Sequence, residues 1–231
     1  MTSPYYEADG VTLYLGDCLE ITEWLAADVL VTDPPYGIGW SRGFHGAKGS
    51  AAHLGIANDH DCGARDAVLV AWGEEHPAVV FGSLYAAAPK GVRHVCVWEK
   101  PPDAGVVGST VGFRRDIEAV YLLNGWPRVN AKRGSVIRGL SRNAGNPSSI
   151  AGRTGHPHAK PGDVLEQLIN ICPPGVIADP FAGSGSTLVA ARNLGRKAIG
   201  VEIRHAEDVR GLDKHGGRVG NVPATHRRQH R

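Results

Sequence analysis

The chain has 231 residues, of which 42% are hydrophobic and 21% charged, and its formal net charge at pH 7 is +2. This size and composition indicate one globular domain, with at most a small appendage, and argue against a multidomain machine and against a disordered chain. No apolar run reaches the ~18 residues of a membrane span, and the first ten residues lack the charged start and apolar core of a signal peptide. We therefore expect a cytoplasmic protein.

Short apolar runs alternate with helix-type patterns along the first 203 residues. Runs rich in β-formers predict strands at 11–15, 29–31, 78–81, 95–98, 117–123, 176–178 and 198–201. Apolar residues at helical spacing predict helices at 61–72, 163–172 and 186–194, and one after Asp17. This last helix should turn four side chains inward: Leu19, Ile21, Trp24 and Leu25. Alternating strands and helices predict an α/β fold with a doubly wound, mostly parallel sheet covered on both faces.

The small net charge hides an uneven distribution along the chain. Residues 1–126 carry 8 basic and 16 acidic side chains, whereas residues 127–162 carry 7 basic side chains and no acidic one. A basic stretch without carboxylates is typical of a surface that binds an anionic partner such as a nucleic acid. The alternative is a solvated loop without a partner. After Glu202 the apolar periodicity ends, so residues 1–203 are predicted to form the domain and residues 204–231 a basic tail rich in Gly, His and Arg.

The cysteines do not form a metal-binding or disulfide pattern. All four are far apart and none belongs to a C-x-x-C pair: Cys18, Cys62, Cys96 and Cys172. The histidines near Cys62 have no repeated spacing either. We therefore expect no metal site and four unpaired thiols.

A glycine-rich segment, residues 179–187, joins a predicted strand to a predicted helix. Its two glycines allow a sharp turn and a close approach to a ligand, but Leu188 replaces the third glycine of the dinucleotide fingerprint and no phosphate-loop lysine follows. Asp179 ends one strand, and Glu202 ends the next 23 residues later, near the spacing at which a carboxylate meets ribose hydroxyls. Two carboxylates suit S-adenosylmethionine, which has a ribose, an ammonium and a sulfonium group. The alternative is an ordinary tight turn.

A second segment, Asp33-Pro34-Pro35-Tyr36, follows a predicted buried strand and should lie at the carboxyl edge of the sheet. The two prolines make it stiff and extended, without amide hydrogens at residues 34 and 35. The Asp33 carboxylate and the Pro34 carbonyl are then two acceptors that can hold an exocyclic amino group and direct its lone pair toward a methyl donor. Tyr36 offers a face on which an extruded base can stack.

Together these segments resemble the motifs of the amino-group DNA methyltransferases, which modify N6 of adenine or N4 of cytosine. Three segments carry the resemblance: 33–36, 154–161 and 179–187. Weaker similarity occurs at residues 16–17, 98–101 and 113–118. The catalytic segment precedes the cofactor segment, as in the circularly permuted group called β-class. The resemblance covers residues 11 to 203, departs from the usual pattern at His158 and Ala159, and implies the Rossmann-like fold of class I S-adenosylmethionine-dependent methyltransferases.

The resemblance also implies a role for each matching position. The catalytic residues would be Asp33, Pro34, Pro35 and Tyr36. S-adenosylmethionine would be bound by Asp17, Lys160, Asp179, Phe181, Gly183, Ser184, Gly185, Ser186, Thr187 and Glu202. In this set Asp17 would lie near the cofactor adenine, Lys160 beside the methionine end, and Glu202 on the ribose. Residues 127–155 would be a short target-recognition segment, in which double-stranded DNA would be contacted by Arg128, Lys132, Arg133, Arg138, Arg142 and Arg153.

The implied function is that of a site-specific DNA methyltransferase that transfers a methyl group from S-adenosylmethionine to the amino group of a flipped base. Asp33 at the first catalytic position favours adenine N6, and cytosine N4 is the main alternative because either amino group fits two acceptors. Further alternatives are an RNA or protein-amide methyltransferase and a non-enzymatic DNA-binding module. A homodimer and a cognate restriction nuclease, as in restriction-modification pairs, are partners that the sequence leaves open.

Overall fold

The computed structural model describes residues 2–38, 59–100, 112–127, 133–139, 160–203 and 218–219. Within these ranges the strands are β1 (Tyr6–Ala8), β2 (Val11–Leu15), β3 (Val29–Thr32), β4 (Ala78–Gly82), β5 (Val92–Glu99), β6 (Ile117–Leu123), β7 (Val136–Arg138), β8 (Ile177–Asp179), β9 (Ala198–Glu202) and β10 (Arg218–Val219). The helices are α1 (Gly63–Trp72), α3 (Gly162–Ile169), α4 (Ser186–Asn193) and the 3₁₀ helix η1 (Glu23–Ala26).

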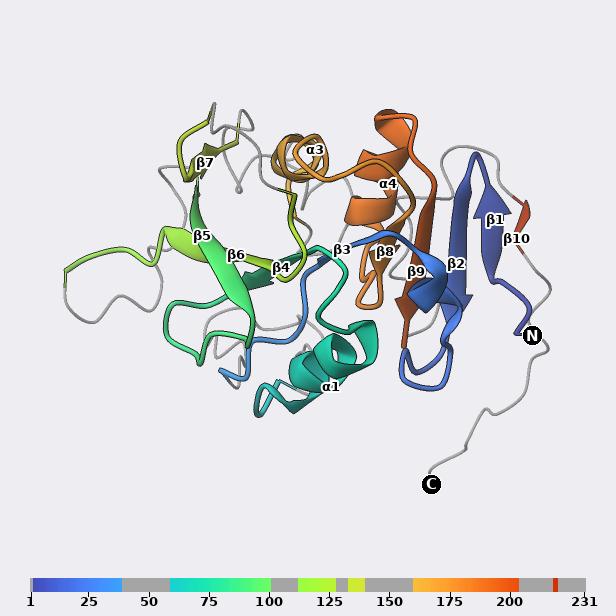
Figure 1. Ribbon diagram of the computed structural model, residues 1–231, viewed down its shortest axis with the longest axis horizontal. Helices are drawn as coiled ribbons and strands as arrows, with labels where there is room; N and C mark the ends of the chain where they lie inside the picture. Colours follow the sequence, from blue (N-terminus) through green and yellow to red (C-terminus); the bar gives the residue numbers. More distant parts are fainter. Residues whose placement is uncertain are drawn as a thin grey trace, which may run out of the picture.

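All the described strands belong to one sheet, in the order β10-β1-β2-β9-β8-β3-β4-β6-β5-β7 (Figure 1). The centre, from β2 to β4, is parallel, whereas β1, β10 and β6 join it through antiparallel pairs. β3 and β8 are far apart in sequence but adjacent in the sheet. The ends of these two strands therefore bring the predicted catalytic and cofactor segments to the same edge, where ligands bind in open α/β sheets.

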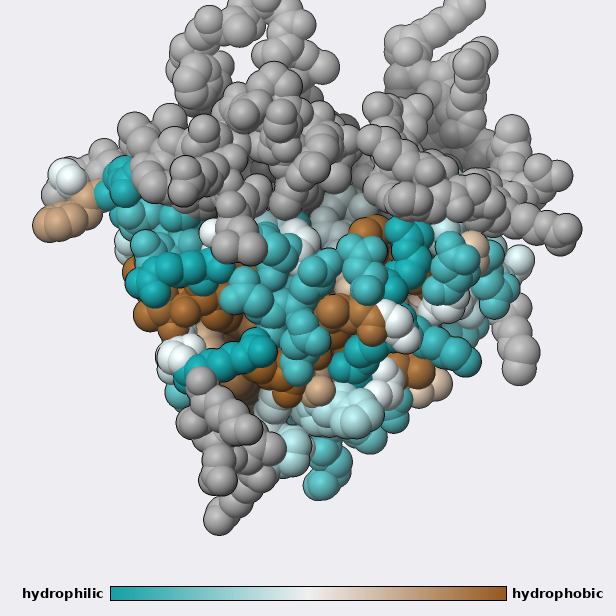
Figure 2. All heavy atoms as spheres, turned by 90° about the horizontal axis from the view of Figure 1, so that it is seen from above, coloured by the Kyte–Doolittle hydropathy of each residue, from teal (hydrophilic) through white to brown (hydrophobic). Residues whose placement is uncertain are grey.

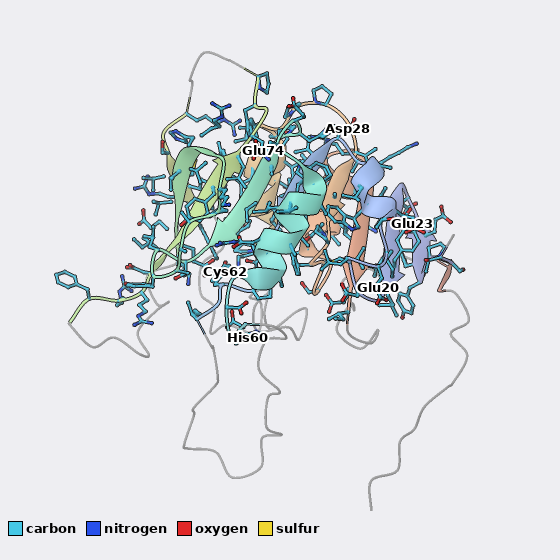
Figure 3. All side chains as sticks on the ribbon, turned by 60° about the horizontal axis from the view of Figure 1, so that its bottom comes forward. Glu20, Glu23, Asp28, His60, Cys62 and Glu74 are labelled. Carbon is cyan, nitrogen blue, oxygen red and sulfur yellow. The ribbon has the colours of Figure 1, made fainter. Side chains whose placement is uncertain are left out.

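The antiparallel strand β6 brings a further part of the chain to this edge. Gly82, the last residue of β4, pairs with Ala119, and Trp98 near the end of β5 pairs with Glu118. The beginning of β6 and the end of β5 therefore lie beside the carboxyl ends of the parallel strands. In Figure 3, Asp28 marks the beginning of β3, and Cys62 lies at the opposite edge of the sheet, where the first turn of α1 starts.

Hydrophobic clusters cover both faces of the sheet. Alternate residues of β3 separate between them: Val29 and Val31 pack in the cluster that includes Leu165 of α3 and Leu188 of α4, whereas Leu30 packs in the other. That second cluster contains Trp24 of η1 and the α1 residues Val68 and Trp72. Figure 1 shows α3 and α4 on one side of the sheet and α1 on the other. The doubly wound, mostly parallel α/β fold is thus confirmed.

The sequence predicted the central strands and three helices, and the structure confirms them with small shifts at their ends. Helix α3 begins one residue before the predicted start, with Pro161 at the cap position and Asp163 in the first turn. The three short strands β1, β7 and β10 were missed. Since residues 204–217 and 220–231 lie outside the described ranges, the domain boundary at residue 203 stays a prediction. In the described ranges, no helix is long and apolar enough to cross a membrane.

The prediction of a helix after Asp17 is wrong. Only the short η1 forms, and Leu19 and Leu25, expected to point inward, are 47% and 37% exposed. The Asp17 carboxylate accepts the amide of Leu19 at 2.9 Å, which favours a turn over a helix at this position. The Trp24 indole donates to the carbonyl of Cys18 at 2.8 Å within the segment. Trp24 is also buried and stacks on Trp72 of α1, with ring centroids 5.9 Å apart, so a tertiary contact holds the segment.

Candidate active site

The catalytic segment emerges from β3 into the edge described above. The Tyr36 hydroxyl lies 2.7 Å from Asp33 Oδ1 and 3.0 Å from Glu118 Oε2, and its one hydrogen can be donated to only one of them at a time. Gly37 ends the segment with φ +71°, and a Cβ at this position would lie 2.5 Å from the backbone of Asp61. A glycine is therefore required where the chain turns away from Tyr36.

Two lysines and two carboxylates form a charge cluster next to this segment. The Lys160 ammonium donates to Asp33 Oδ2 at 2.6 Å and lies 3.4 Å from Glu118 Oε2. Lys100 pairs with the other oxygen of Glu118 at 2.7 Å. In the structure the Lys160 ammonium contacts the predicted catalytic carboxylate, and its expected place beside the methionine end of a cofactor stays a prediction.

Aromatic rings surround the Lys160 ammonium. Its nitrogen lies 5.2 Å from the ring centroid of Phe81, 5.5 Å from that of Tyr36 and 5.9 Å from that of Trp98. Phe81 and Trp98 meet edge to face with centroids 6.4 Å apart. These rings give the charge cluster apolar walls, so that the charges interact in a medium that screens them less than water does.

Burial and neighbouring charges shift the pKa values in this cluster. Burial raises the pKa of Asp33, and the Lys160 ammonium opposes that shift. Burial also acts to raise the pKa of Glu118, but Lys160 and Lys100 outweigh it and lower that pKa to about 2. Burial acts to lower the pKa of Lys160, but Asp33 and Glu118 raise it instead. Burial and the neighbouring carboxylates raise the pKa of Tyr36 well above its usual value, so its phenol keeps its proton at neutral pH.

The glycine-rich segment after β8 lies directly beside the catalytic segment. Asp179 is buried, and its Oδ1 accepts the hydroxyl of Thr32 at 2.7 Å and the amide of Phe181 at 3.2 Å. Burial raises the pKa of Asp179 to about 6, against hydrogen bonds from Thr32 and Thr187. Because Thr32 immediately precedes Asp33, this contact links the two predicted halves of the site.

Glu202 at the end of β9 holds the turn of the glycine-rich segment. Its Oε2 accepts the amide of Gly183 at 2.7 Å, and its carbonyl accepts the amide of Gly16, next to Asp17, at 2.9 Å. Gly183 and Gly185 have φ of +50° and +77°, which favour glycine, and Gly185 caps α4 without any side-chain hydrogen bond. The amides at the start of α4 therefore face the same edge as the carboxylates.

Close packing of α4 on the sheet does not need the missing third glycine. A Cβ on Gly200 of β9 would lie 2.7 Å from Leu188 Cδ1 and 3.1 Å from the Cβ of Ala182. Leu188 thus fills the space that Gly200 leaves open. Close contact between α4 and β9 is thus permitted by a glycine of the strand and not by a glycine of the helix.

The cofactor side also includes a cysteine that the sequence did not single out. Cys18 is buried, and its pKa is raised to about 11, chiefly by burial and then by the charges of Asp17, Asp179 and Glu202. The charges of all three carboxylates therefore reach Cys18. Ser184 and Ser186 lie with their hydroxyl oxygens 2.7 Å apart, and Ser184 and Thr187 are buried.

The basic residues predicted to contact DNA are only partly described. Arg138 is 70% exposed and pairs with Glu99 at 2.9 Å, while Arg133 is exposed. The remaining four lie outside the described residues: Arg128, Lys132, Arg142 and Arg153. The pair with Glu99 shows that part of the acid-free stretch has an acidic partner from another strand.

His60 and Cys62 lie near each other at the start of α1 (Figure 3). Among the residues that the structure describes, no group of three or more His, Cys, Asp or Glu side chains could hold a metal ion.

Sequence reasoning missed several residues of the site: Thr32, Phe81, Trp98, Lys100 and Glu118. Lys100 and Glu118 fall in the segments of weaker similarity, which was the available signal. Their spacing to Asp33 and Lys160 carries no information, because the antiparallel pair of β5 and β6 brings them together.

A family model described as DNA methylase, named for N6 and N4 methyltransferases, matches residues 85–207, which is more than half of the chain. The chain belongs to this DNA methylase family. The resemblance to amino-group DNA methyltransferases, which use S-adenosylmethionine, is thereby confirmed.

The chain is also similar in sequence to individual methyltransferases. The type II methyltransferase M.ScaI of Streptomyces caespitosus is 28% identical over 87% of this chain and 80% of its own length. The putative methylase YubD of Escherichia coli strain K12 is 29% identical over 81% of this chain and 82% of its own length.

Solved structures of related enzymes have the same fold. The M1.HpyAVI–SAM complex superposes with a TM-score of 0.60 at 20% identity, covering 88% of this chain and 98% of its own. The cytosine-N4-specific PvuII DNA methyltransferase also reaches 0.60, at 17% identity, covering 88% of this chain and 85% of its own. These likenesses confirm the class I methyltransferase fold and leave the choice between adenine and cytosine undecided.

Proposed function

We propose that this DNA methylase transfers a methyl group from S-adenosylmethionine to N6 of a flipped adenine in double-stranded DNA. The observation that carries the proposal is the contact of Thr32 with Asp179 at 2.7 Å, which brings the catalytic segment and the glycine-rich segment to one point of the sheet edge. A base held at Asp33 and a ligand held at residues 179–187 would therefore be neighbours, as direct transfer between them requires.

The catalytic segment would hold the target amino group by hydrogen bonds. An N–H donated to the Asp33 carboxylate and another to the Pro34 carbonyl draw the nitrogen toward tetrahedral geometry, so that its lone pair points at the methyl carbon. The bound cofactor would supply the methyl group, whose C–S electron pair would stay on sulfur as the N–C bond forms. The nitrogen would then release one proton to the Asp33 carboxylate or to water. Tyr36 would support the extruded base by stacking.

The cofactor side fits S-adenosylmethionine in its chemistry. Carboxylates of Asp17, Asp179 and Glu202 are acceptors for an ammonium and for ribose hydroxyls, and the uncapped start of α4 offers amide donors. Gly183 adopts the positive φ of this turn and has no Cβ that would crowd a ligand. When bound, the cofactor supplies an electrophilic methyl group on a sulfonium.

Asp33 at the first catalytic position supports adenine as the target, and cytosine N4 is the second candidate because the PvuII enzyme of the same fold is cytosine-N4-specific. The test is nucleoside mass spectrometry of unmethylated DNA incubated with the purified protein and S-adenosylmethionine. We expect N6-methyladenine. Finding N4-methylcytosine without N6-methyladenine would overturn the choice of base, and finding neither would overturn the proposed activity.

Cofactor binding should weaken as the pH falls through about 6. Burial raises the pKa of Asp179 to about 6, so below that pH the free protein carries a neutral acid where a cation is to bind. If Asp179 must be ionised, affinity should drop about tenfold for each pH unit below its pKa. Calorimetric titration between pH 5 and 8 measures this slope. Asp179→Asn should lose it, and a parental slope in that variant would assign the pH dependence to another group.

The basic residues should control how DNA binding depends on salt. Removal of one cationic side chain that neutralises a phosphate should flatten the slope of log K against log[salt] by ~1. We expect a variant with Ala at Arg133, Arg138 and Arg142 to bind DNA with a flatter slope while methylating at saturating DNA and low salt. Fluorescence anisotropy at several salt concentrations measures the slope. A slope equal to that of the parent would favour the alternative, in which the basic stretch is a solvated loop that does not bind DNA.

A further inference from the structure

Both oxygens of the Asp33 carboxylate are engaged in this structure. The Tyr36 hydroxyl lies 2.7 Å from Oδ1, and the Lys160 ammonium lies 2.6 Å from Oδ2. Methyl transfer as proposed above requires this carboxylate to accept an N–H of the target amino group. An ammonium and an amino group are similar in size and donate to the same acceptor. The ammonium and the target amino group would therefore compete for the same carboxylate.

The aromatic walls lead to the same conclusion. The Lys160 nitrogen lies 5.5 Å from the ring centroid of Tyr36, on which the base would stack, and within 5.9 Å of those of Phe81 and Trp98. A flat base on Tyr36 would compete with the ammonium for this space. Entry of the base thus requires Lys160 to give up Asp33.

A displaced ammonium needs another partner inside the protein. The Lys160 side chain is only 11% exposed, and an unpaired buried charge is strongly unfavourable. Glu118 Oε2 already lies 3.4 Å from its nitrogen, so a small movement of the lysine would bring it into full contact. Lys100 holds the opposite oxygen of Glu118 at 2.7 Å and fixes the position of this second carboxylate.

We propose that Glu118 is a positioning residue that receives the Lys160 ammonium when the target base enters, and that this exchange releases Asp33 to hold the target amino group. The inference rests on the proposed function. In this proposal Glu118 acts through Lys160 and contacts neither the base nor the cofactor.

The charges around Asp33 suit such an exchange. Asp33 is faced by Lys160 from the segment before α3, by Glu118 from β6, by Asp179 from β8 and by the Tyr36 hydroxyl. Lys100, after β5, pairs with Glu118. The pKa of Glu118 is about 2, whereas that of Asp33 is raised above its usual value. Glu118 is therefore charged, and able to hold the ammonium, at every pH at which Asp33 is ionised.

The test compares two variants that should shift the activity profile in opposite directions. Glu118→Gln keeps the shape but removes the charge, so Lys160 pairs with Asp33 alone. We expect the single-turnover rate of methyl transfer, measured with labelled S-adenosylmethionine and unmethylated DNA, to fall at least tenfold. Cofactor affinity should stay within about twofold. The acid limb of the pH–rate profile should move to lower pH, since a negative charge that raises the pKa of Asp33 is gone.

Lys100→Met should act in the other direction. Without Lys100, Glu118 attracts Lys160 more strongly, Asp33 is less well paired, and the acid limb should move to higher pH. A merely structural role of the cluster would lower the rate in both variants without opposite shifts. Glu166→Gln is the matched control, because Glu166 is a half-buried carboxylate of α3 that accepts a hydrogen bond from Asn193 and is not part of the charge cluster.

Three results would overturn the proposal: a parental rate in Glu118→Gln, limbs that move in the same direction in the two variants, or a rate loss explained by a lowered melting temperature alone. If Glu118→Gln does not fold, the direction of the shift in Lys100→Met decides. A failure of the proposed function is distinguishable, because the unmodified protein would then methylate no DNA.

Discussion

Replacing Asp33 by Ala should reduce methyl transfer by about 10³-fold or more, because the target amino group loses its charged acceptor and its orientation toward the methyl donor. S-adenosylmethionine affinity should stay within a few-fold, since the cofactor contacts come from the other side of the Thr32–Asp179 link. The fold should survive, because Lys160 retains Glu118 as a partner. Radiolabelled methyl transfer and calorimetry measure the two quantities on the same preparation.

Asp33→Asn is the informative companion of this variant. An amide keeps an oxygen acceptor of the same size but loses the charge that pairs with Lys160. Its rate should lie between those of the parent and Asp33→Ala. Retained activity in Asp33→Ala would refute the role of this carboxylate.

The second large effect concerns the cofactor carboxylates. Glu202→Ala should weaken S-adenosylmethionine binding by ~1.5–3 kcal/mol, the worth of a hydrogen bond to a charged group, which is about 10- to 150-fold in affinity. The variant also removes the acceptor of the Gly183 amide, which orders the turn. Asp179→Ala should have an effect of similar size, with an added cost in stability because Thr32 and the Phe181 amide lose their buried acceptor.

Calorimetric titration of the cofactor into each variant tests this prediction, and thermal melting separates loss of binding from loss of fold. Glu166→Gln again serves as the control for loss of a carboxylate elsewhere in the fold. Unchanged affinity in both Glu202→Ala and Asp179→Ala would remove the cofactor assignment of this edge.

The described surface agrees with a protein whose apolar contacts lie in its interior. Among the coloured residues of Figure 2, hydrophilic side chains are interspersed with hydrophobic patches. The large apolar side chains of the sheet, such as Phe81, Leu30 and Ile177, are fully buried. What distinguishes the site is therefore not an exposed apolar patch but buried charge at one sheet edge.

The sequence was sufficient for the parts of the fold that depend on local pattern. β3, β4 and β8 are continuous apolar runs, and a strand buried on both faces leaves this signal. The segment after Asp17 failed because a side-chain–backbone bond and the tertiary contact of Trp24 decided it. The strands β1, β7 and β10 span only two or three residues, too few for a periodic signal.

The two linear motifs of the site could also be predicted from the sequence, because each is contiguous and follows a strand. The charge cluster could not be predicted. Its members come from four places in the chain, and only the sheet topology brings them together. These places are the segment after β3, the residue after β5, the start of β6 and the segment before α3. The contact between Lys160 and Asp33 has the same origin.

The most direct test of the central claim is to express the protein, and separately its Asp33→Ala variant, in a host that lacks DNA methylation, and to map modified bases by single-molecule sequencing. We expect adenines modified within one short sequence in the first strain and none in the second. Genomic DNA without modified amino groups in the first strain, or modification that persists in the Asp33→Ala strain, would contradict this mechanism.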